Sequence, residues 1–118
     1  MAGGYFFNME KFVPDTDRIR ELNDELRTSF KGGKIATTPG VLALGDLPAI
    51  LKQLREFSDF DPGNDTYGEH DFGSFRHNVQ LLFWKIDYYD PELMMGSSDP
   101  AEPALTSRVL TLMLSDEY

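Results

Sequence analysis

The stretch Val79–Tyr89, VQLLFWKIDYY, decides the fold predicted for this chain. Its residues alternate between two faces as in a half-buried β-strand, because successive side chains of a strand point to opposite sides. One face is predicted to be core and carries Leu82, Trp84, Ile86 and Tyr88. The other face changes from apolar to polar along its length and carries Leu81, Phe83, Lys85, Asp87 and Tyr89.

Residues 70–76 (HDFGSFR) are predicted as a weaker strand that pairs with this one. The turn is expected at His77–Asn78, since Asn tolerates a positive φ. Gly73 interrupts the alternation and predicts a β-bulge. The expected central feature is therefore a long hairpin over about residues 70–89.

Two helices are predicted upstream of the hairpin. The first begins at an N-cap, Asp15 or Thr16, and is expected to end at Gly32–Gly33. Its apolar stripe is Ile19, Leu22, Leu26 and Phe30, at helical spacing. The second helix covers roughly 46–57, with Asp46 as N-cap and Pro48 in its first turn.

Two further segments complete the predicted elements. Residues 34–38 (KIATT) are β-branched and predict a short strand, with a turn at Pro39–Gly40 behind it. Residues 104–114 fit helical spacing and also alternate as a strand would. Of these two interpretations, the helix is favoured.

The predicted fold class is α+β: a small antiparallel sheet built around Trp84, with two or three helices packed on one face. A chain of 118 residues suffices for one domain. That domain is expected over residues 14–118, after an N-terminal arm over 1–13. The aromatic residues of the arm are expected to pack on the body or on a second copy, which makes a homodimer joined through the arm possible.

The composition excludes several classes of function. The net charge of −9 and the pI near 4.5 argue against direct binding to nucleic acid or to an anionic membrane, which require a basic face. The absence of cysteine excludes disulfides, thiol catalysis and thiolate metal sites. No stretch predicts a membrane span or a signal peptide, so we expect a cytoplasmic protein, and no motif implies a cofactor.

The negative charge is concentrated in the second half of the chain. Residues 56–118 carry 13 Asp and Glu against three bases, Arg76, Lys85 and Arg108, for a net −10. Residues 1–55 carry the remaining +1 of the total. The acidic half is either a solubilising surface or a face that docks on a basic protein.

The densest polar group is Glu69–His70–Asp71, which the hairpin would bring near Lys85, Asp87 and Tyr89. A histidine oriented by a carboxylate can act in general acid–base catalysis. One hypothesis is therefore a small hydrolase with His70 as base and Glu69 or Asp71 orienting it. Because no known catalytic motif accompanies these residues, a structural polar network is favoured.

The loop 58–68 (SDFDPGNDTYG) spaces Asp59, Asp61 and Asp65 as calcium-binding loops do. Asn64 stands where such loops need glycine, and His70 where they need a bidentate glutamate. Asx turns are therefore favoured and no metal site is predicted. Met94–Met95 is interpreted as a pair of core gap-fillers, with a soft binding surface as the alternative.

The strings YGEHDFG (67–73) and WKIDYYD (84–90) are distinctive. Further matching strings are RIRELNDELR, KIATTPGV and the C-terminal SDPAEPALTSRVLTLMLSDEY. Through these strings the chain resembles a DUF3768-like family of short alphaproteobacterial proteins of unknown function, over roughly residues 17–118. The resemblance implies an association with mobile elements such as plasmids and prophages. It implies no catalytic residues.

Charge, size, missing motifs and this resemblance predict a small non-enzymatic binding protein. It would dock its acidic surface on a basic nucleic-acid-handling protein, as an anti-CRISPR or anti-restriction inhibitor that mimics DNA. The predicted binding residues are Asp59, Asp61, Asp65, Glu69, Asp71, Lys85, Asp87, Tyr89 and Asp90. The alternatives are the small hydrolase and a homodimeric structural protein with no ligand.

Overall fold

The computed structural model describes residues 15–118, so the predicted N-terminal arm and the dimer contact assigned to it lie outside the described residues. The helices are α2 (Thr16–Ser29), α3 (Pro39–Ala43) and α4 (Leu47–Glu56). The strands are β1 (Lys34–Thr37), β2 (Phe72–His77), β3 (Gln80–Tyr89) and β4 (Ser107–Leu114). Two 3-10 turns, η1 (Pro103–Leu105) and η2 (Ser115–Glu117), flank β4.

The four strands form one mixed sheet in the order β1-β4-β3-β2. β3 is antiparallel to both of its neighbours, β2 and β4, whereas β1 is parallel to β4. The α+β class is confirmed, and the expectation of a purely antiparallel sheet is wrong at β1. Parallel neighbours need a long crossover connection, and here α3, α4 and the β2–β3 hairpin lie between the two strands.

The helix expected over 104–114 is wrong, because this segment forms β4. Ser107–Leu114 is a central strand with hydrogen-bonded neighbours on both sides. Its side chains at Arg108, Leu110 and Leu112 are buried on the helix-covered face. A sequence that fits both the helical and the strand period adopts the structure that its neighbours in the fold stabilise. Here β1 and β3 provide hydrogen-bond partners on both edges of β4.

The hairpin is confirmed, with its turn one residue later than expected. Asn78, at φ 54°, and Val79 connect β2 to β3. The predicted bulge at Gly73 is wrong, since pairing runs without interruption from Phe72 opposite Lys85 to His77 opposite Gln80. Gly73 serves close packing instead: a Cβ there would lie 2.5 Å from Trp84 Nε1 and 2.7 Å from Phe57 Cζ.

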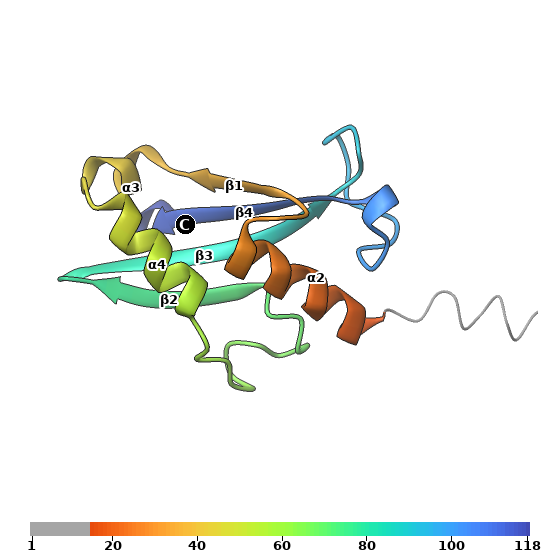
Figure 1. Cartoon of the computed structure of the whole chain (residues 1–118), viewed down its shortest axis with the longest axis horizontal. Coiled ribbons are helices and arrows are strands. Elements are labelled where there is room, and N and C mark those ends of the chain that lie inside the picture. Colours follow the sequence, from red (N-terminus) through yellow and green to blue (C-terminus); the bar gives the residue numbers. More distant parts are fainter. Residues whose placement is uncertain (1–14) are drawn as a thin grey trace, which may run out of the picture.

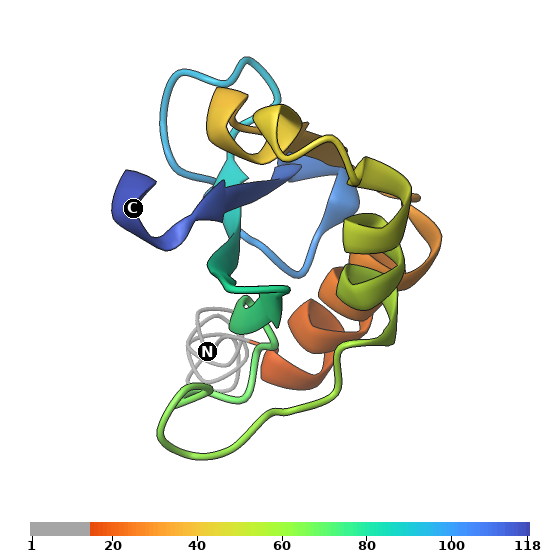
Figure 2. The same ribbon diagram turned by 90° about the vertical axis from the view of Figure 1, so that its left-hand side faces the viewer.

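The core lies between the sheet and the helices. Figure 1 shows α2 and α4 across one face of the sheet, and Figure 2, viewed along the strands, shows both on the same side of it. Trp84 is fully buried, and the ring of Phe57 meets it edge-on with centroids 5.4 Å apart. The buried cluster comprises Leu26, Val41, Ile50, Leu54, Leu82, Trp84, Ile86, Leu110 and Leu112.

The first helix is confirmed, with a different end and a different buried stripe. Asp15 is its N-cap and accepts a hydrogen bond from the Arg18 amide at 3.1 Å. The helix ends at Phe30, which takes the left-handed conformation at φ 60°, before the glycines are reached. Asn23 and Arg27 are buried on its inner face with Ile19 and Leu26.

Arg27 explains why a charged residue belongs on that face. Its Nη1 donates to the backbone carbonyls of Leu54, Arg55 and Phe57 at 3.1, 3.2 and 2.8 Å. These carbonyls lie at the C-terminal end of α4, where no helical donors remain. The guanidinium therefore caps α4 and fixes it against α2.

The short helix α3 replaces the turn expected at Pro39–Gly40. Thr38 is its N-cap, and Pro39 occupies its first turn. The Glu117 carboxylate accepts hydrogen bonds from Thr38 Oγ1 at 2.6 Å and from the Gly40 amide at 3.2 Å. The C-terminal turn thus holds α3 against the end of β4.

We predict that Gly73→Ala destabilises the protein by about 1–3 kcal/mol, because the added methyl overlaps Trp84 and Phe57. Urea unfolding of the full chain measures the effect. Gly96→Ala is the matched control, since its Cβ would meet only Tyr88 O, at 3.9 Å. Equal stability of the two variants would contradict the close packing at Gly73.

Candidate functional site

A buried polar network joins α2, β3 and β4 to the loop before β2. Arg108 Nε donates to Asn23 Oδ1 at 2.8 Å, and Asn23 is fully buried. Asn23 Nδ2 donates to the Tyr88 hydroxyl at 2.7 Å and to the Glu69 carbonyl at 3.0 Å. The Tyr88 hydroxyl in turn donates to Glu69 Oε1 at 2.7 Å. The network fixes Glu69, one of the predicted binding residues, to the end of the sheet.

Arg108 is the charged member of this network. Only 2% of its surface is exposed, and it also donates to the backbone carbonyl of Pro100. Its guanidinium lies 5.2 Å from the centroid of the Tyr88 ring. Burial lowers the pKa of Arg108 and, together with the hydrogen bond to Glu69, raises the pKa of Tyr88. The Tyr88 hydroxyl therefore stays protonated at neutral pH and remains a donor to Glu69.

His70 is held by carboxylates other than those expected. Its Nδ1 lies 2.9 Å from Asp24 Oδ1, on α2, and its Nε2 lies 3.5 Å from Asp65 Oδ2. The ring stacks on Phe60 with centroids 3.7 Å apart and planes 5° from parallel. Both ring nitrogens face carboxylates, so His70 connects the loop to α2, and Glu69 faces Tyr88 instead.

Asp65, Glu69 and Asp71 lie where the loop meets the sheet, and Asp87 lies on the adjacent strand β3; we call these four acidic residues the carboxylate cluster. The pKa of Asp71 is raised by its partial burial and, next, by the negative charge of Glu69. Asp65 and Asp87 raise it further. These neighbouring negative charges disfavour the ionised form of Asp71 and give its surroundings a negative potential.

Asp59 and Asp61 lie in the exposed loop next to this cluster. Asp61 Oδ1 accepts hydrogen bonds from the amides of Gly63 at 2.7 Å and Asn64 at 3.0 Å, which is an Asx turn. Within residues 15–118, no three His, Asp or Glu side chains come together as a metal site would require. The spacing that resembles a calcium loop thus builds a turn in which Asp59 and Asp61 are exposed, whereas Asp65 faces His70 with 8% of its side chain exposed.

Lys85, Asp87 and Tyr89 lie on the sheet face that the two long helices leave open. Lys85 Nζ is 3.1 Å from Asp87 Oδ2, and this contact raises the pKa of Lys85. The three residues line a pocket of about 410 Å³. Its remaining walls are Thr38, Thr111, Met113, Glu117 and Tyr118.

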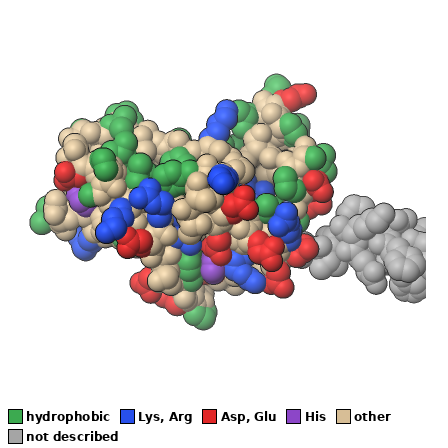
Figure 3. Space-filling view, viewed as in Figure 1, with side chains coloured by type: hydrophobic (Ala, Val, Ile, Leu, Met, Phe, Trp, Pro, Cys, Tyr) green, Lys and Arg blue, Asp and Glu red, His purple; other side chains and the backbone are tan. Residues whose placement is uncertain are grey.

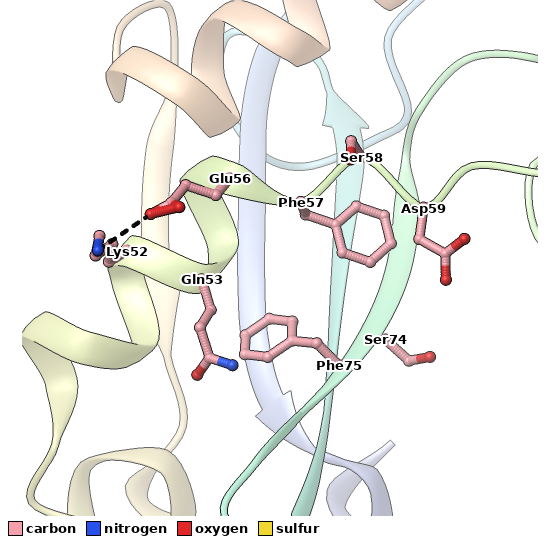
Figure 4. Close-up of a pocket in the computed structure, with 8 residues that line it drawn as sticks. All are labelled: Lys52, Gln53, Glu56, Phe57, Ser58, Asp59, Ser74 and Phe75. Carbon is pink, nitrogen blue, oxygen red and sulfur yellow. Dashed lines mark ion pairs between the residues drawn. The ribbon is translucent and has the colours of Figure 1, made fainter.

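A second hollow, of about 530 Å³, lies between α4 and β2. Figure 4 shows Phe57 and Phe75 along it, with the Lys52–Glu56 ion pair at its edge. The ion pair spans 3.6 Å between exposed side chains. Neither of these two pockets is lined by Glu69, His70 or Asp71.

The predicted binding residues therefore occupy three neighbouring regions. Asp59 and Asp61 lie on the loop, the carboxylate cluster lies at its junction with the sheet, and Lys85 and Tyr89 lie on the open face. Asp90 caps a turn by accepting from the Met94 amide at 3.0 Å. Figure 3 shows that, on one face of the molecule, Asp and Glu alternate with Lys and Arg and do not form one continuous patch.

Sequence reasoning missed the buried polar residues Asn23, Arg27 and Arg108. The available signal was weak: Asn23 follows Ile19 by four positions and so falls on the apolar stripe. Its partners Tyr88 and Arg108 are 65 and 85 positions further along the chain. The interpretation of Met94–Met95 as gap-fillers is also wrong, because the exposed fraction is 79% for Met94 and 71% for Met95.

We predict that Asp71→Asn stabilises the protein at pH 7. The raised pKa means that folding is less favourable once Asp71 ionises, so removing the charge removes this penalty. The gain should shrink as the pH falls toward 3.8, where Asp71 becomes protonated in both the folded and unfolded states. Urea midpoints at pH 7 and pH 4 measure this, with Asp59→Asn as control; a pH-independent gain would contradict the interpretation.

No helix described here has the length and apolarity to cross a membrane. Searches of curated proteins and of solved structures found no match. A family model described as "Protein of unknown function (DUF3768)" matches residues 37–117, a narrower range than the sequence resemblance suggested, because α2 lies outside it. The match covers more than half of the chain, and the protein therefore belongs to the DUF3768 family of proteins of unknown function.

Proposed function

We propose that this protein is a small binding protein without catalytic chemistry, which docks its acidic surface on a basic nucleic-acid-handling protein. The observation that carries the proposal is the set of acidic residues at this end of the molecule: the exposed Asp59 and Asp61 of the loop lie next to the carboxylate cluster, in which burial and then the charge of Glu69 raise the pKa of Asp71. Assembling like charges opposes folding, so a partner that supplies positive charge would relieve the repulsion.

The surroundings of the cluster also support binding. Asp59 and Asp61 add exposed carboxylates from the adjacent loop, and the Asx turn at Asp61 orders that loop before any partner arrives. A preordered loop loses less conformational entropy on association. Glu69 is held by Tyr88, so its carboxylate is also fixed in position.

The concrete form of the proposal is an inhibitor of a host-defence nuclease, of the anti-CRISPR or anti-restriction type, encoded on a mobile element and acting in the cytoplasm. Carboxylates would take the place of DNA phosphates in the basic groove of the target. Such an interaction depends on counterion release and weakens steeply with salt. It also competes with DNA for the same groove.

The proposal predicts the properties of the complex captured by the immobilised full chain from an extract of the source organism. The captured partner should be basic, should dissociate as salt rises from ~50 to ~300 mM, and should be displaced by a double-stranded oligonucleotide. Asp59→Asn combined with Asp61→Asn should weaken its binding about fivefold.

The matched control removes the same charge from the exposed surface of α2, through Glu21→Gln combined with Glu25→Gln. We expect this control to bind as the unmodified chain does. A partner whose binding is indifferent to salt, or that is retained in the presence of excess oligonucleotide, would refute the proposal.

A further inference from the structure

The end of the sheet opposite the β2–β3 turn carries two joined turns, residues 90–106, which we call the tip. In Figure 1 the tip projects beyond the ends of β3 and β4. Its first turn, 90–96, closes through a bridge between Tyr89 and Gly96. Its second turn, 99–105, ends in η1.

Hydrogen bonds hold the tip in one shape. The Asp90 amide donates to the Met95 carbonyl at 2.8 Å, and Asp90 Oδ1 accepts from the Met94 amide at 3.0 Å. Ser97 Oγ joins the two turns by donating to the Leu105 carbonyl at 2.9 Å. Buried Arg108 secures the second turn through the Pro100 carbonyl.

Within this ordered tip, large apolar side chains face solvent. The exposed fractions are 46% for Leu93, 79% for Met94, 71% for Met95 and 44% for Leu105. Leu93 adopts a φ of 61°, a conformation that is unfavourable for a residue with a branched side chain. Three successive apolar residues displayed by a strained, hydrogen-bonded turn are typical of a binding anchor, since folding alone gains nothing from their exposure.

The charged residues of the tip itself have one sign. Between Lys85 and Arg108 the sequence contains no Lys or Arg. The tip itself carries four acidic residues: Asp90, Glu92, Asp99 and Glu102. Arg108 itself is buried, so it cannot neutralise them at the surface. The tip is therefore an apolar anchor with an acidic rim.

We propose that Leu93, Met94 and Met95 insert into an apolar cleft of a partner protein whose rim is lined by Lys and Arg. This inference rests on the proposed function and adds to it an apolar anchor at a second, defined place. A central apolar contact surrounded by complementary charge is the usual organisation of a strong interface. Methionine suits the role because its flexible thioether adapts to the shape of a cleft.

The acidic rim favours a basic-rimmed partner protein over a second copy of this chain and over an anionic membrane. Two tips meeting in a homodimer would oppose four carboxylates to four more, which Coulomb repulsion disfavours. An anionic membrane would be repelled for the same reason. Only a basic-rimmed protein surface satisfies the apolar residues and the charges together.

The test uses a defined probe with this chemistry, a short amphipathic peptide built only of Leu and Lys. Titration into the ¹⁵N-labelled full chain should shift the amide resonances of residues 90–106. Met94→Ser combined with Met95→Ser should weaken binding of the peptide about tenfold. Val79→Ser is the matched control, since Val79 is an apolar residue of similar exposure in the turn at the other end of the sheet, and it should change binding less than about twofold.

Three results would overturn the inference. The first is that the Leu–Lys peptide shifts only resonances at the hollow between α4 and β2 or at the carboxylate cluster. The second is that the full chain self-associates and the double Ser variant does not, and the third is that the tip binds phosphatidylcholine vesicles. A peptide of Lys alone separates the two proposals. If this peptide binds the carboxylate cluster in a salt-dependent way while the Leu–Lys peptide leaves the tip resonances unshifted, the proposed function stands and only the anchor proposal fails. If neither peptide binds, both proposals fail.

Discussion

The buried guanidinium of Arg108 is the constraint on which the rest of the structure depends. A charge taken out of water needs hydrogen-bond partners, and here Asn23 and the Pro100 carbonyl provide them while the Tyr88 ring packs against the cation. Each partner belongs to a different segment. One buried side chain therefore fixes α2, β3 and the second turn of the tip relative to β4.

This constraint links the fold to both candidate surfaces. Asn23, held by Arg108, also holds the Glu69 carbonyl, so the loop that carries the carboxylate cluster is joined to the same network. The sheet and helices give a rigid support, and the acidic and apolar groups are displayed from loops at its end. Arg27 acts in a similar way one turn further along the same face of α2, where it caps α4.

The elements with a strong local pattern could be predicted from the sequence, and the contacts between remote segments could not. Period-two alternation placed Leu82, Trp84 and Ile86 on the buried face of β3, and cap residues placed the starts of α2 and α4. The hairpin also placed Asp71 beside β3, where its carbonyl accepts from the Ile86 amide, because strand register is a local consequence of a short turn. The strand β4, the parallel partner β1 and the pairing of His70 with Asp24 depend on segments far apart in the chain. No periodicity carries that information.

The most direct measurement of this dependence is amide hydrogen exchange, followed by mass spectrometry, on the full chain with Asn23→Leu. This variant keeps the number and branching of the side-chain heavy atoms and removes the hydrogen-bond partner of Arg108, Tyr88 and Glu69. If the network positions both surfaces, exchange should accelerate in residues 65–71 and 97–106 together, while the β2–β3 hairpin keeps its protection. Unchanged exchange in either segment would show that it is held by its own local hydrogen bonds, and would contradict the central role of the network.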